Sequence, residues 1–272
     1  MGIGPGEAAH ISRRAINVLQ SVEAIAGYTT YIDLIRPLIS EKQVVISTGM
    51  TKERERVHAA VRTALAGKSC ALVSSGDPGI YAMAGLVFEI CRENGIALLP
   101  LSYTGPENPE TKALRFEVVP GIPALCAGAS LLGAPLMHDF AAISLSDLLT
   151  PWDTIEARLA AAAESDFVIV LYNPKSRRRK THLERAQQII LRYREKETPV
   201  GIVTRAMRDG EQVRIVPLKE LHTAEVDMQT TVFIGNSATR RYAEFMVTPR
   251  GYSDKYDLRD ADPGRPSASV KN

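Results

Sequence analysis

SSGDPGIY at positions 74–81 is the stretch that decides the fold of this chain. An apolar run at residues 70–73 precedes it and indicates a strand, and a helical pattern follows it. In open α/β sheets ligands bind outside the carboxyl ends of the strands, which is where this turn would lie. Gly76 lets a ligand approach the backbone closely, and Pro78 fixes φ where a helix would begin. The turn therefore predicts either a ligand site or a simple strand-to-helix turn, in which Asp77 accepts hydrogen bonds from a ligand or caps the helix.

The composition is that of an average soluble globular protein, with 45% hydrophobic and 24% charged residues. A length of 272 residues allows one large domain or two ordinary ones, and a formal net charge of +2 gives no reason to expect nucleic acid or a membrane surface as partner. The three cysteines have no metal-ligand spacing and are expected to be small buried hydrophobes. Since no apolar run approaches the roughly 20 residues of a membrane span and no signal peptide is visible, we expect a cytoplasmic protein.

Short apolar runs alternate with helical patterns through the first part of the chain, which predicts βα units and a largely parallel sheet. Strands are expected at 24–28, 44–46, 69–73, 96–101 and 116–119, and helices at 12–23, 53–65 and 82–92.

The chain opens on a glycine-rich loop, GIGPG, at residues 2–6. This loop matches neither the Walker A loop nor the dinucleotide-binding G-x-G-x-x-G, and Pro5 removes a backbone donor. We therefore expect one wall of a small-ligand site, and before it either a first strand that is clipped to a residue or two or a sequence that begins after that strand.

A domain junction is expected at residues 120–124, PGIPA, where a helix of small residues follows. The sequence thus predicts an N-terminal α/β domain at 1–119, a C-terminal α/β domain at 120–252 and a disordered tail at 253–272. In the second domain Asp209-Gly210 predicts a hairpin. Further strands are expected at 140–145, 166–172, 199–204, 212–217, 230–235 and 244–247, and helices at 125–132, 152–163 and 181–193.

A basic run at residues 175–180 follows the end of an apolar strand, beside Tyr172-Asn173-Pro174. Such a run is commonly a solvated face, but arginines at a strand end also suit a ligand with several carboxylates. Nucleic acid is a poorer partner because the net charge is near zero and no aromatic platform is interleaved. The five histidines show no metal-ligand spacing, and no Ser/His/Asp set or G-x-S-x-G elbow is present.

Taken together, the motifs resemble those of the tetrapyrrole (corrin/porphyrin) methyltransferases that use S-adenosylmethionine, and within them the precorrin-3B C(17)-methyltransferase group. The opening loop, the 75–78 turn and the 119–124 junction match motifs of the whole family, although other members carry Tyr-Met-Gly where this chain has Tyr172-Asn173-Pro174. The longer matches that select the group lie at 27–31, 74–84, 128–136, 144–152, 171–176, 204–205, 234–237 and 248–252.

This resemblance implies a class III S-adenosylmethionine methyltransferase fold, with two α/β domains and the active site in the cleft between them. Asp77 would lie nearest the methionine amino group or the reacting centre and is the implied catalytic residue. The side chains that would bind the cofactor are Pro5, Ser75, Gly76, Asp77, Ile80, Pro123, Ala124, Tyr172, Asn173, Thr204, Thr231 and Val232. Arginines that would pair with substrate carboxylates are Arg177, Arg178, Arg205 and Arg240.

The implied reaction is methylation of precorrin-3B, or of its cobalt form, at C17, with ring contraction to precorrin-4, in cobalamin biosynthesis. S-adenosylhomocysteine would be the second product, no metal would be bound by the protein itself, and the enzyme would be a cytoplasmic homodimer. Three alternatives stay open at this point. They are a methyltransferase of the same fold acting at another corrin carbon, a regulatory protein that binds S-adenosylmethionine without turnover, and an RNA methylase with salt-dependent RNA affinity.

Overall fold

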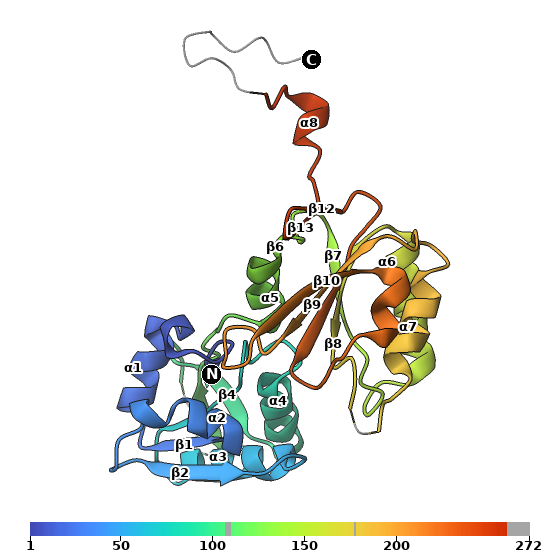
Figure 1. The fold of residues 1–272 in the computed structure, drawn as a ribbon. Coiled ribbons are helices and arrows are strands. Elements are labelled where there is room, and N and C mark those ends of the chain that lie inside the picture. The colour runs from blue at the N-terminus through green and yellow to red at the C-terminus, as the bar shows by residue number, and fades with distance from the viewer. Residues whose placement is uncertain (107–109, 177, 260–272) are drawn as a thin grey trace, which may run out of the picture. The chain divides into compact units, whose positions relative to one another are not determined.

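The computed structural model describes residues 1–106, 110–176 and 178–259, which form two compact α/β units (Figure 1). Unit 1 consists of Met1–Ala127 together with Arg205–Glu211, and unit 2 of Gly128–Thr204 together with the described residues from Gln212 onward. The division falls inside helix α5 (Ala124–Leu132), whereas the sequence placed it before residue 120. The return of Arg205–Glu211 to unit 1 was not predicted.

Unit 1 is built on parallel strands, as its βα alternation predicts. One sheet has the order β2-β1-β3, and a separate parallel pair joins β4 and β5. β2 is an edge strand in which Val44 is 48% exposed, so the prediction of a buried strand was wrong. The strands are β1 (Ala24–Tyr28), β2 (Val44–Thr48), β3 (Cys70–Leu72), β4 (Ala97–Pro100) and β5 (Ala113–Phe116).

The α-helices of unit 1 pack their apolar faces onto these sheets. Ser12 begins α1 as its N-cap, because its Oγ accepts a hydrogen bond from the Ala15 amide at 3.1 Å. Ile3 and Val73 are fully buried in the core that α1 covers, so the opening loop stands on a packed base. The helices are η1 (Ala8–His10), α1 (Arg13–Ser21), α2 (Thr29–Leu34), η2 (Arg36–Leu38), α3 (Glu53–Leu65) and α4 (Met83–Glu93).

Unit 2 contains a five-stranded sheet of order β10-β9-β11-β8-β7. β7 and β8 are parallel, whereas the other neighbouring pairs are antiparallel, and β9 and β10 form the predicted hairpin. Figure 1 shows α6 and α7 together on one face of this sheet, where they bury the main core of unit 2. The strands are β7 (Phe140–Ser144), β8 (Val168–Tyr172), β9 (Pro199–Thr204), β10 (Gln212–Pro217) and β11 (Thr230–Ile234).

Helix α5 packs closely against the same sheet because glycines leave room at the contact. A Cβ on Gly128 would lie 2.7 Å from the Phe233 ring, and one on Gly201 would overlap the Leu132 side chain. Close helix–sheet contact therefore explains the run of small residues that the sequence shows here. The other helices of unit 2 are α6 (Trp152–Glu164), α7 (His182–Ile190), η3 (Leu218–Thr223) and α8 (Tyr252–Lys255).

A small third sheet corrects two expectations for the end of the chain. β13 (Phe245–Val247) pairs with β12 (Arg240–Tyr242) and β6 (Gly133–Ala134), so it does not close the five-stranded sheet as predicted. Helix α8 lies where the disordered tail was expected to begin, and the rest of that predicted tail, 260–272, is outside the described residues. Within the described part of the chain, no helix has the length and apolar content that a membrane span requires.

Candidate functional site

Three backbone segments of unit 1 meet at the 74–81 turn. Ile3 N donates to Ser74 O at 2.9 Å, and Gly76 N donates to Gly4 O at 2.7 Å. On the other side of the opening loop, Gly2 N donates to Val119 O at 2.9 Å. Residues 1–4 form no regular strand and make only two isolated bridges, Gly2 to Ser74 and Gly4 to Gly76, between the turn after β3 and the segment before α5.

The glycines of these segments touch backbone to backbone. A Cβ on Gly2 would lie 2.5 Å from Gly76 O and 2.7 Å from Gly121 N, and one on Gly121 would lie 3.0 Å from Gly2 Cα. Backbone atoms fixed by hydrogen bonds cannot move aside as the end of a flexible side chain can. Glycine is therefore required at Gly2 and Gly121 for the three segments to converge.

Asp77 ties the turn to the segment before α5. Its Oδ1 accepts from Gly79 N at 2.8 Å, and its Oδ2 accepts from Gly121 N at 3.1 Å. Helix α4 begins only at Met83 and has no side-chain cap, so of the two roles that the sequence left open for Asp77, capping this helix is ruled out. Each carboxylate oxygen has a further lone pair, so Asp77 can still accept from a ligand.

An arginine that the sequence did not single out completes the site of unit 1. Arg208, from the returning segment, donates through Nε to Pro5 O and through Nη2 to Ser75 Oγ, the latter at 2.5 Å. Beside it, Glu7 N donates to Met207 O at 3.2 Å. Only its place at a predicted hairpin tip could have drawn attention to Arg208, because its partners are far away in sequence.

The predicted cofactor residues of unit 1 lie close together. Pro5 and Ser75 share Arg208, and Ile80 N donates to Asp77 O at 3.4 Å. At the start of α5, Pro123 Cα and Ala124 N would lie 3.5 Å and 3.7 Å from a Cβ on Gly76.

Unit 2 presents a separate polar edge, at the carboxyl ends of β7, β8 and β9. The register places Ser144 beside Tyr172, and Thr204 beside Thr230 at the start of β11. Asn173, at a φ of 53°, donates from Nδ2 to Ser144 Oγ at 2.9 Å, and the hydroxyls of Thr204 and Thr230 are 2.9 Å apart. The edge therefore offers hydroxyl and amide groups in a fixed arrangement.

The two remaining cofactor predictions, Thr231 and Val232, follow on β11. Thr231 is 7% exposed, and Val232 is fully buried in the core of unit 2. Their role as ligand contacts stays a prediction.

The 146–152 loop beside this edge is held by an imidazole that sequence reasoning missed. His182 Nε2 lies 3.0 Å from Asp147 Oδ2, and this hydrogen bond holds the pKa of the Asp147 carboxyl below its usual range. The Trp152 ring packs edge-on against His182 with centroids 4.7 Å apart, and Arg185 lies over Trp152 at 4.4 Å. This loop is thereby fixed to the start of α7.

The structure separates the predicted substrate arginines. Arg178 is exposed just beyond β8, Arg205 is exposed in the returning segment of unit 1, and Arg177 lies outside the described residues. Arg240 lies at the opposite end of the unit 2 sheet, where β11 ends. Arg240 and Arg178 therefore do not share a site.

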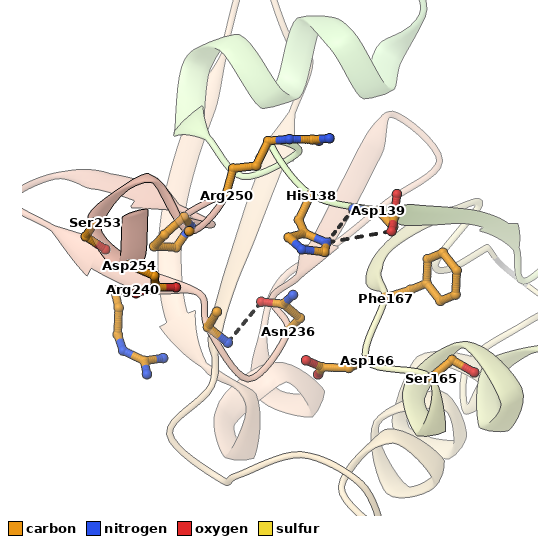
Figure 2. A pocket seen from close by; sticks show the side chains of 13 residues that line it. His138, Asp139, Ser165, Asp166, Phe167, Asn236, Arg240, Arg250, Ser253 and Asp254 are labelled. Atoms are coloured by element: carbon orange, nitrogen blue, oxygen red, sulfur yellow. Dashed lines mark hydrogen bonds and ion pairs between the residues drawn. The ribbon is translucent and has the colours of Figure 1, made fainter. Parts of the chain in front are cut away.

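Figure 2 shows the hollow on unit 2 that Arg240 lines, with His138, Asn236 and Arg250 around it. The hollow has a volume of about 560 Å³. Arg240 Nη1 donates to Ser237 O at 2.7 Å and to Thr239 O at 2.8 Å, and His138 lies 3.8 Å from Asp139 Oδ2. Among the described residues, no group of three or more His, Cys, Asp or Glu side chains is placed to hold a metal ion.

Comparison with known proteins gives consistent matches in sequence and in structure. The sequence model of the tetrapyrrole (corrin/porphyrin) methylases matches residues 1–222. A cobalt-factor III methyltransferase from Priestia megaterium is 49% identical over 100% of this chain, which spans 48% of that longer protein. A probable cobalt-factor III C(17)-methyltransferase from Salmonella typhimurium is 45% identical over 93% of this chain and 98% of its own length.

Among solved structures, the methyltransferase CobJ matches with a TM-score of 0.78 and 33% identity, over 91% of this chain and 97% of its own. Uroporphyrin-III C-methyltransferase from Thermus thermophilus, solved with bound S-adenosylhomocysteine, matches with a TM-score of 0.62 and 20% identity, over 86% of this chain and 95% of its own. At that identity the second match concerns the fold alone.

Proposed function

Because the chain belongs to the tetrapyrrole (corrin/porphyrin) methylase family, we propose that it methylates C17 of cobalt-factor III or precorrin-3B, with S-adenosylmethionine as donor, in cobalamin biosynthesis. Ring contraction accompanies methylation in this proposal. The relatives that are 49% and 45% identical carry the assignment, since both are named for cobalt-factor III. The single structural observation behind it is the convergence of the opening loop, the 74–81 turn and the start of α5 in unit 1.

The groups gathered in unit 1 fit the donor chemically. S-adenosylmethionine, when bound, supplies a methyl group on a sulfonium sulfur, which is already activated for transfer. The Asp77 carboxylate can accept hydrogen bonds from an ammonium group or a ribose hydroxyl of the ligand. The Ser75 hydroxyl can donate or accept a hydrogen bond, and the Pro5 carbonyl can accept one. In this proposal Asp77 orients the donor and keeps the turn in place.

The chain's main task in such a reaction is alignment. Holding two reactants in a productive geometry lowers a barrier by roughly 7–11 kcal/mol in favourable cases. Tyr172, Asn173 and Thr204, on the polar edge of unit 2, would also contact the donor, and Arg178 and Arg205 would pair with substrate carboxylates.

The proposal includes a homodimer working in the cytoplasm. The cysteines support a reducing compartment, because all three are free thiols. Sedimentation equilibrium on the purified chain would measure its oligomeric state.

Incubation with methyl-labelled S-adenosylmethionine and cobalt-factor III tests the activity. NMR of the product should show the label on C17, whereas a label on another carbon would indicate a different corrin methyltransferase. Binding of the donor with no methylated macrocycle, for cobalt-factor III and precorrin-3B alike, would favour a regulatory protein and overturn the proposal.

A further inference from the structure

Arg208 is a half-buried guanidinium without a counter-ion among the described residues. Its Nε and Nη2 bond a carbonyl and a hydroxyl, which are neutral groups, whereas the exposed Arg14 pairs with the Glu117 carboxylate. Burial lowers the pKa of the Arg208 guanidinium, and the group that acts against this is the Tyr31 phenol rather than a carboxylate. A charge held away from water in this way is stabilised when an opposite charge joins it.

The opening loop is shaped around this side chain. A Cβ on Gly6 would lie 2.5 Å from Arg208 Nε and 2.8 Å from Cδ, so the arginine occupies space that only glycine leaves. Pro5 O and Ser75 Oγ then fix the guanidinium at the point where the opening loop meets the 74–81 turn. The position of the charge is thus built into the site.

Arg56 is a second cation that, like Arg208, acts on Tyr31. Arg56 is 3% exposed, and its guanidinium donates to Thr48 Oγ1 at 2.7 Å and to Gly49 O at 3.0 Å. Both Arg56 and Arg208 act on the Tyr31 phenol, whose pKa is raised by burial and lowered by each of them. Burial has the largest effect, so the pKa of the phenol is raised overall, but the two guanidiniums still place positive charge in its surroundings.

We propose that Arg208 binds a carboxylate of a small-molecule ligand at the opening loop, with Tyr31 beside it. Resting on the proposed function, this carboxylate belongs either to the methionine part of the methyl donor or to the tetrapyrrole. The planar fork of guanidinium can pair bidentately with a carboxylate. A phosphate fits less well, because Pro5 removes one of the loop amides that a phosphate cradle uses.

Binding calorimetry on the full chain and on Arg208→Met tests the proposal, with S-adenosylhomocysteine, 5′-methylthioadenosine, cobalt-factor III and its methyl ester as probes. The first pair differs by the amino acid part that carries the donor carboxylate, and the second pair by the carboxylates of the macrocycle. Arg62→Met, an exposed arginine on α3, is the matched control. Arg208→Lys retains the charge and should regain part of the lost affinity.

If the donor supplies the carboxylate, Arg208→Met should weaken S-adenosylhomocysteine binding by about 10- to 100-fold and leave 5′-methylthioadenosine unchanged. If the tetrapyrrole supplies the carboxylate, Arg208→Met should weaken the binding of cobalt-factor III by a similar factor and leave the binding of its methyl ester unchanged. Equal losses within both pairs would show that Arg208 only supports the loop, and unchanged affinities throughout would show no role; either result overturns the proposal. If the unmodified chain binds neither S-adenosylhomocysteine nor cobalt-factor III, the proposed function is refuted, and this inference with it.

Discussion

Replacing Gly121 by alanine should destabilise unit 1 and disturb its loops. The added Cβ would overlap Gly76 O and lie 3.0 Å from both C and Cα of Gly2, whereas carbon atoms in contact prefer about 3.5–4.0 Å. The backbone segments must therefore separate by roughly 0.5–1 Å, because no flexible side chain is available to move instead.

The cost follows from the hydrogen bonds that cross this contact. Gly2 N to Val119 O at 2.9 Å, Gly4 N to Gly76 O at 3.3 Å and Gly121 N to an Asp77 oxygen at 3.1 Å would all be stretched. At about 1 kcal/mol each the loss is about 3 kcal/mol, within the range measured for overpacked sites. The thermal midpoint of unit 1 should fall by about 6–12 °C.

Differential scanning calorimetry of the full chain measures this shift, and Gly85→Ala provides the control. Nothing lies within 4 Å of a Cβ on Gly85, which is inside α4, so the same substitution there should raise stability by about 0.5–1 kcal/mol. If Gly121→Ala melts at or above the wild-type temperature, the contact among the three segments does not constrain unit 1.

The contacts described also predict the effects of two further substitutions and the reactivity of two cysteines. Asp77→Asn removes an acceptor from one of two backbone amides and should lower stability by about 1–3 kcal/mol in urea unfolding, while the exposed Asp33→Asn should have little effect. Burial raises the pKa of Cys70 to about 11, so at pH 8 a thiol reagent should modify exposed Cys126 much faster than Cys70 in the folded chain; equal rates at the two thiols would contradict this. The pKa of Asp147 is held below its ordinary 3.8 by the imidazole on α7, so its stabilising effect is present above that pH and is lost as pH falls through the lower folded value. Asp147→Asn should therefore be less stable than wild type at neutral pH and converge with it in strong acid, as pH-dependent melting would show.

Local signals predicted the elements well, because their causes lie within a few residues. Ser12 starts α1 through its own hydroxyl, the helix at Glu53–Leu65 has the expected bounds, and Asp209-Gly210 turns β9 into β10. The motif residues also lie close together, since Pro5, the 74–81 turn and Pro123 meet in unit 1.

Non-local contacts account for what was missed. Nothing near residue 245 in sequence shows that β13 pairs with β6 at Gly133 rather than joining the main sheet. The partners of Arg208 and His182 are likewise distant, so neither could be assigned from its neighbours. The sequence left open whether Asp77 caps a helix or accepts hydrogen bonds from other groups, because both roles look alike in sequence, and only the late start of α4 rules out the cap.

The return of Arg205–Glu211 to unit 1 has a consequence for the order in which the molecule is made. Arg208 lies 203 residues after Pro5, the carbonyl that it bonds. During synthesis from the amino end, the opening loop leaves the ribosome long before its arginine exists. The loop that is made first therefore gains its contact with Arg208 only late in synthesis. A nascent chain that ends at Ala127 would lack this contact.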